Sequence, residues 1–230
     1  MPRTVEIKLA LAAVLPLIGQ IRVLTAANKT DPEVQVLLDL FKPPFGETGV
    51  IAINGDAALA ILRASSFIRL QLRRGPLAAI PDELIEGELD ANQYTGSERT
   101  SVLCYQFLIQ VQAIVLENFP APTFLGNMVA RWIARFLSAF RNASRSPDQT
   151  SQIVVRNDPV NSLRYVTLAL RRELGLTEAV AKKFADEINQ ARTAVVWQGA
   201  HSQAGARIHA LQAWHLDVFH SPATIDQRRP

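Results

Sequence analysis

The sequence predicts an all-α protein in one or two lobes, with at most one short β element near residues 49–55. Apolar residues recur at about the helical period of 3.6 along most of the chain, and several of these segments open with a capping residue and close with glycine. The 230 residues are 48% hydrophobic and 20% charged. This composition is typical of a folded chain with a buried core and excludes broad disorder.

An N-terminal helical lobe is predicted over residues 1–96. Residues 9–27 are apolar enough for a helix, which Pro16 interrupts. Asp31 and Pro32 then start a second helix, because aspartate caps the first turn and proline fits its first position.

The same lobe contains the strand candidate. Residues 49–55 are short, rich in branched side chains, and end in an Asn-Gly turn signal. Asp56 is expected to cap a helix that runs to Arg74. Residues 76–96 carry five acidic side chains and no basic one, so we predict an acidic loop there, at the boundary between the lobes.

A C-terminal basic helical lobe is predicted over residues 97–220, with an extended tail at 221–230. Its helices are expected at 98–118, 124–144, 159–174, 178–198 and 204–219. Expected helix starts are Thr123, Asp158 and Thr177, and expected C′ glycines are Gly175 and Gly199.

Charge is distributed unevenly along the chain. Residues 1–96 hold 9 basic and 11 acidic side chains, whereas residues 97–230 hold 15 basic and 10 acidic ones. Arginine supplies 19 of the 24 basic residues. This bias suits bidentate pairing with phosphate, although a GC-rich genome would produce it without any function.

Residues 123–145 form the most one-sided basic segment, with four arginines and no acid. On a helical wheel the arginines fall within an arc of about 120°, opposite a face of large apolar side chains. That face requires burial, while the basic face could meet phosphate, the acidic residues 82–90, or solvent alone. The arginines are Arg131, Arg135, Arg141 and Arg145.

Two further sets of charged residues are candidate binding residues, one for nucleic acid and one for self-assembly. A second basic patch near the end of the helix 57–74 is expected to give secondary nucleic-acid contacts, although cations at a helix C-terminus are also favoured by the helix dipole. It consists of Arg63, Arg69, Arg73 and Arg74. The acidic loop is the candidate for self-assembly, by facing a basic surface of the next copy. It consists of Asp82, Glu83, Glu86, Glu88 and Asp90.

The sequence favours neither catalysis nor a bound cofactor. Cys104 is the only cysteine, which excludes an intramolecular disulfide and a four-cysteine zinc site. Phosphate-binding glycine loops and nucleophile-elbow motifs are absent from the sequence. The four histidines are separated by 8, 6 and 5 residues, spacings that do not place them on one helical face, so we predict no metal site. The histidines are His201, His209, His215 and His220. Together these observations predict that the protein is not an enzyme.

Two viral families resemble parts of the chain. The order of residues 107–120, 124–142 and 158–176 resembles the nucleocapsid protein of phlebovirus-like viruses, in which helical lobes enclose single-stranded RNA. The order and spacing of residues 5–20, 27–42 and 184–214 resemble the matrix protein of influenza-type orthomyxoviruses, which lines a membrane. Both resemblances imply an all-helical, self-assembling structural protein without enzymatic activity.

The resemblances imply genomic RNA, further copies of the chain and an anionic membrane surface as partners. They imply a location in the virion and the host-cell cytoplasm. Nucleic-acid packaging is the first expectation and a membrane-lining matrix protein is the alternative. A soluble, intracellular cellular adaptor that binds neither polyanion is the third.

Overall fold

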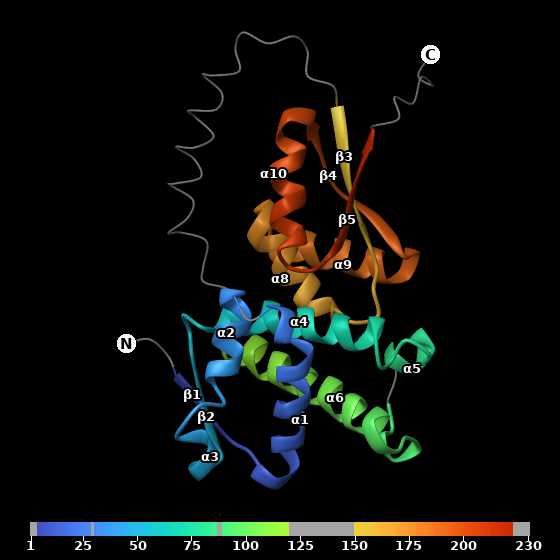
Figure 1. Cartoon of the computed structure of the whole chain (residues 1–230). Coiled ribbons are helices and arrows are strands. Elements are labelled where there is room, and N and C mark those ends of the chain that lie inside the picture. The colour runs from blue at the N-terminus through green and yellow to red at the C-terminus, as the bar shows by residue number, and fades with distance from the viewer. Residues whose placement is uncertain (1–3, 29, 87–88, 120–149, 223–230) are drawn as a thin grey trace, which may run out of the picture. The chain divides into compact units, whose positions relative to one another are not determined.

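The computed structural model describes residues 4–28, 30–86, 89–119 and 150–222. The chain divides into two compact units (Figure 1). Unit 1 comprises Met1–Pro120 and Asp158–Tyr165, and unit 2 comprises Ala121–Asn157 and Val166–Pro230. Each unit is described separately below.

The all-α prediction is wrong. The described residues form helices together with two antiparallel sheets, one of two strands and one of three. Each strand is five to eight residues long, and a segment this short carries little periodicity to separate it from a helical turn. The all-helical fold that both viral resemblances imply is therefore not found.

Unit 1 begins with a strand and a helix and is mainly helical afterwards. Its elements are β1 (Thr4–Lys8), α1 (Leu11–Leu24), the 3-10 turn η1 (Ala26–Asn28), α2 (Pro32–Asp39), α3 (Phe45–Thr48), β2 (Val50–Asn54), α4 (Ala58–Arg74), α5 (Asp82–Glu86), η2 (Ala91–Gln93) and α6 (Gly96–Asn118). The helix start predicted at Asp31 is confirmed, because its carboxylate accepts hydrogen bonds from the backbone N–H groups of Glu33 and Val34. The predicted strand at 49–55 is confirmed as β2.

Strand β2 pairs with β1 in a two-stranded antiparallel sheet, the β1–β2 sheet, and helices α1, α2 and α3 lie between the two strands in the sequence. Ile51 and Ile53 are almost completely buried on one face of β2, whereas Ala52 is exposed on the other. This alternation is what a strand with one buried face requires. β1 was not predicted: residues 4–8 precede the helix expected over 9–27 and were assigned no element within the N-terminal helical lobe.

The core of unit 1 lies where α4 packs against α2 and α6, and α6 against α1. Ile61, Ile68 and Leu72 of α4 are fully buried, as are Val102 and Leu108 of α6. Helix α6 is long and apolar enough to cross a membrane, but half of its most apolar window is buried inside the protein. It was predicted as a buried core helix at the start of the C-terminal lobe, and here it belongs to unit 1.

Unit 2 contains a three-stranded antiparallel sheet with strand order β4-β3-β5. Its elements are β3 (Thr150–Arg156), α8 (Leu163–Leu174, whose first residues are assigned to unit 1), α9 (Glu178–Ala191), β4 (Thr193–Ala200), α10 (His201–Gln212) and β5 (Asp217–Pro222). Helix α10 contacts all three strands. The inward side chains Ile153 and Val155 of the central strand are buried.

Two predicted helices of unit 2 extend too far. The helix expected over 178–198 ends at Ala191, because Arg192 adopts a left-handed conformation with φ 64° and the branched residues after it form β4. The helix expected over 204–219 begins and ends earlier, and β5 occupies 217–222. Gly199, predicted as a C′ residue, lies instead within β4.

The helix predicted over 159–174 begins later, at Leu163, so Asp158 does not start it. Two other predicted features are confirmed. Gly175 follows α8 with φ 70°, and the hydroxyl of Thr177 accepts the N–H of Val180 at the start of α9. The helix predicted at 124–144 lies outside the described residues.

Candidate functional site

The principal basic arc of the sequence lies outside the described residues, so its role stays a prediction. It consists of Arg131, Arg135, Arg141 and Arg145. The second basic patch is described, and most of it is engaged within unit 1.

Two arginines of the second patch form ion pairs. Arg63 of α4 donates to Glu33 of α2 at 2.9 Å, and its side chain is 17% exposed. Arg73 donates to Asp82 at 2.6 Å and to the carbonyl of Leu77. These contacts hold neighbouring segments to α4, so little of either guanidinium is left for a phosphate.

Arg69 is buried in the middle of α4, with 4% of its surface exposed. Its guanidinium donates to the side-chain carbonyl of Gln112, to the hydroxyl of Tyr105 at 3.1 Å and to the backbone carbonyl of Val160. It also lies over the Tyr105 ring, 4.7 Å from the centroid. Arg69 therefore attaches α6 and the segment 158–165 to α4, which is a structural role.

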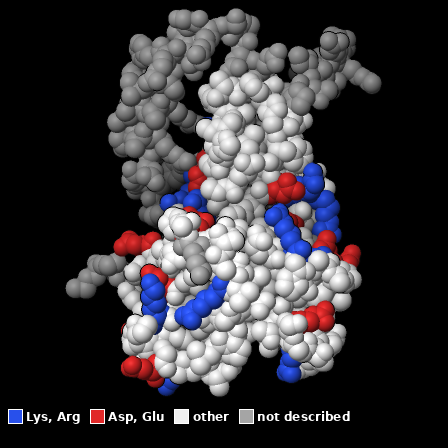
Figure 2. Space-filling model, viewed as in Figure 1, with Lys and Arg blue, Asp and Glu red and all other residues white. Residues whose placement is uncertain are grey.

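Arg74, at the end of α4, is exposed and is the member of the patch best placed to meet an external anion. Over the face shown in Figure 2, basic and acidic side chains are interspersed on the described residues. A surface of mixed charge does not generate the single-signed field that attracts a polyanion.

The acidic residues proposed for self-assembly have several environments. Asp82 pairs with Arg73, and Asp90 accepts the N–H of Asn92 at the start of η2. Glu83 is exposed on α5. The side chain of Glu86, and Glu88 altogether, lie outside the described residues. Contacts of this loop with another copy stay a prediction.

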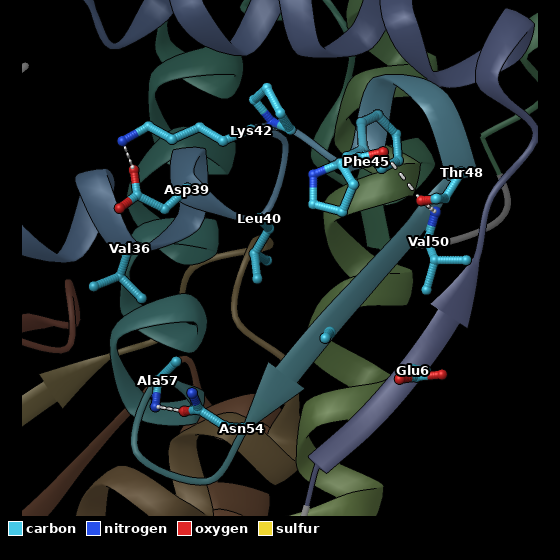
Figure 3. Close-up of a pocket in the computed structure, with 13 residues that line it drawn as sticks. Glu6, Val36, Asp39, Leu40, Lys42, Phe45, Thr48, Val50, Asn54 and Ala57 are labelled. Carbon is cyan, nitrogen blue, oxygen red and sulfur yellow. Dashed lines mark hydrogen bonds and ion pairs between the residues drawn. The ribbon is translucent and has the colours of Figure 1, made fainter.

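The described part of unit 1 contains a groove of about 550 Å³ beside the β1–β2 sheet (Figure 3). Val50, Ala52 and Asn54, the outward residues of β2, line it together with Glu6 of β1. Glu6 pairs in register with Ala52, so these side chains share one face of the β1–β2 sheet. The opposite wall comes from α2 and the loop after it, through Val36, Asp39, Leu40, Lys42, Pro43 and Pro44.

The free edge of β2 also belongs to this groove. The N–H of Leu9 donates to the carbonyl of Gly49 at 2.7 Å, which makes residues 49, 51 and 53 the ones that hydrogen-bond to β1. The N–H and C=O groups of Val50, Ala52 and Asn54 consequently point away from β1. The N–H of Val50 is bonded to the hydroxyl of Thr48, whereas Ala52 lies exposed at the centre of the edge.

The polar groups of the groove have a net negative charge. Lys42 and Asp39 form an exposed ion pair at 2.6 Å, which leaves the carboxylate of Glu6 as the excess charge. Asn54 uses its side-chain oxygen to accept the N–H of Ala57. The remaining wall is apolar, so the groove combines a backbone edge, apolar contact area and a carboxylate.

Sequence reasoning missed the groove because β1 was missed. The alternation within residues 50–54 was visible, but a lone strand has no sheet face or edge to assign. The alternation of Val5 and Ile7 with Glu6 and Lys8 was the available signal, and it would have given the second strand.

Two buried titratable groups among the described residues are poorly suited to catalysis. Cys104 is fully buried in α6, and burial raises the pKa of its thiol to about 12, which keeps it protonated and unreactive. Burial also raises the pKa of Asp158, whose carboxylate caps the backbone of Val160 and Asn161. Among the described residues, no group of three or more His, Cys, Asp and Glu side chains is placed to hold a metal ion together.

Comparisons with known proteins do not assign the chain. No protein-family model matches it, and no curated protein matches its sequence.

Proposed function

We propose that the protein is a non-enzymatic adaptor that binds an extended segment of a partner protein in the groove beside β2. The observation that supports this most directly is the exposed edge of β2, whose central residue Ala52 points its backbone groups away from β1. A peptide strand added there would extend the β1–β2 sheet to three strands, and its main-chain hydrogen bonds would supply affinity.

The walls of the groove indicate which segment would bind. An extended peptide places alternate side chains on opposite faces, so one set would meet Val36 and Leu40 of the α2 wall. The excess carboxylate of Glu6 favours a positively charged peptide side chain on the face that lies toward the β1–β2 sheet. We therefore expect a segment in which apolar and basic residues alternate.

The direct test is fluorescence polarisation with a labelled peptide of alternating valine and lysine, roughly six residues long, the length of a typical strand. A peptide of the same sequence, N-methylated at every amide, is the control, because neither of its edges can donate backbone hydrogen bonds to β2. Binding of the first peptide and not of the second is the expected result. Equal binding of both would show that strand addition is not the mode of recognition.

Two proline variants make the test specific to β2. Ala52→Pro removes the outward N–H at the centre of the edge, and we expect it to lower peptide affinity by at least about tenfold. Thr4→Pro is the matched control, because Thr4 pairs with Asn54 and its N–H points outward from the other strand. We expect Thr4→Pro to bind as the wild type does. Unchanged binding by Ala52→Pro would reject the proposed groove.

Nucleic-acid packaging by a self-assembling protein is the second candidate. The acid-free sequence of residues 123–145, with its four arginines, supports it. Retention on single-stranded RNA that falls steeply with salt is the expected result for this function, and absence of binding at low salt would reject it. Flotation with anionic liposomes, without RNA binding, would instead favour the membrane-lining alternative. The adaptor is expected to bind neither polyanion.

A further inference from the structure

A cluster of two histidines and a serine lies in unit 2, whereas the residues that line the groove belong to unit 1. Ser151 of β3 is 1% exposed, and its hydroxyl lies 2.9 Å from Nδ1 of His201 and 2.9 Å from Nε2 of His220. The two imidazole rings meet edge to face, with centroids 5.1 Å apart. Two ring nitrogens thus converge on one oxygen atom.

The fold brings these residues together from three elements. His201 is the first residue of α10, His220 lies on β5, and Ser151 lies on β3 between β4 and β5. The spacing argument considered histidines on one helix and could not detect this arrangement. His201 and His220 are both exposed, so the two rings can be reached from solvent.

The chemistry of the cluster matches a transition-metal ion. A neutral imidazole nitrogen is a ligand for Zn²⁺, Ni²⁺ and Cu²⁺, at about 2.0–2.1 Å for zinc. Small rotations of the exposed rings would admit a metal ion between the two ring nitrogens. Bonds to the metal ion would then replace the hydrogen bonds between these nitrogens and the Ser151 hydroxyl. The Ser151 oxygen and water can complete the coordination shell.

We propose that His201 and His220 form a binding site for a divalent late transition-metal ion, with Ser151 holding the two rings in convergence. The site provides two imidazole ligands instead of four protein ligands, so the bound ion exchanges with free ions in solution. The order of affinity follows the general preference of nitrogen sites, with Cu²⁺ bound more tightly than Ni²⁺. This proposal is independent of the peptide groove in unit 1.

The test is calorimetric titration of the full chain, without a polyhistidine tag, with Zn²⁺, Ni²⁺ and Cu²⁺ separately. We expect one site of the stated affinity order, and we expect His201→Ala and His220→Ala each to lower the affinity at least about tenfold. His209→Ala is the matched control, since His209 is exposed on the same helix and outside the cluster. It should bind as the wild type does.

Three results would overturn the proposal. One is the absence of saturable binding of any of the three ions. Another is unchanged affinity in both His201→Ala and His220→Ala. The third is an equal loss in His209→Ala, which would indicate nonspecific binding by surface histidines. Circular dichroism of each variant shows whether its fold is retained, and thus whether a lower affinity reflects loss of the imidazole ligand or loss of the fold. Both mutated histidines are exposed, so we expect the fold to be retained.

Discussion

Arg69 provides the sharpest test of how unit 1 is held together. Replacement by methionine keeps a side chain of similar length and removes the guanidinium. The carbonyl oxygens of Gln112 and Val160 then lose their donor while they stay buried, whereas the hydroxyl of Tyr105 retains the carbonyl of Pro159 at 3.5 Å. Each buried acceptor without a donor costs about 1–3 kcal/mol.

Two such acceptors give a loss of about 2–6 kcal/mol. Removal of a buried cation recovers part of its desolvation cost, which lowers the expected loss to about 3 kcal/mol. Arg74→Met is the control on the same helix, and because Arg74 is exposed we expect it to change stability by less than about 0.5 kcal/mol.

Urea unfolding followed by far-UV circular dichroism measures the difference in free energy of unfolding. Hydrogen exchange provides a local measurement, and we expect it to accelerate in residues 158–165 of the Arg69→Met variant, because Arg69 attaches that segment to α4. If Arg69→Met and Arg74→Met had the same stability and exchange, the structural role assigned to Arg69 would be refuted.

Three further predictions concern single residues. Gly199→Ala should destabilise unit 2 and shift the fluorescence emission of Trp197, because an added Cβ would lie 2.5 Å from that ring. Gly205→Ala in α10, where an added Cβ would have open space around it, should instead stabilise the protein by up to about 1 kcal/mol. Cys104 should resist alkylation at pH 8 in the native state and react after unfolding in urea. Burial raises the pKa of Asp158, so as the pH falls the folded chain binds that proton before the unfolded chain does. This group should therefore stabilise the fold increasingly as the pH approaches 3.8, and Asp158→Asn should remove the effect from pH-dependent unfolding curves.

The sequence predicted those structural features that depend on residues close together in the chain. The cap at Asp31, the left-handed Gly175 and the apolar helix around Cys104 depend on neighbouring residues, and each was identified correctly. Strand pairing depends on distant residues. β4 follows α9 after a single left-handed residue, Arg192, which is not a residue type that marks a helix end.

The candidate sites could not be predicted for the same reason, because they depend on contacts between residues that are distant in the sequence. The basic character of Arg69 was visible in the sequence, but its burial depends on Gln112 and Val160, which are far away along the chain. The groove requires β1 to lie beside β2, and the histidine cluster requires β5 to lie beside β3. Neither arrangement follows from spacing on one element.

Hydrogen exchange at the amide of Ala52, measured by NMR with and without the valine–lysine peptide, tests the adaptor function most directly. A peptide strand paired with β2 would hydrogen-bond that N–H, and we predict exchange at least about tenfold slower in its presence. Binding of the peptide with unchanged exchange at Ala52 would contradict recognition along this edge.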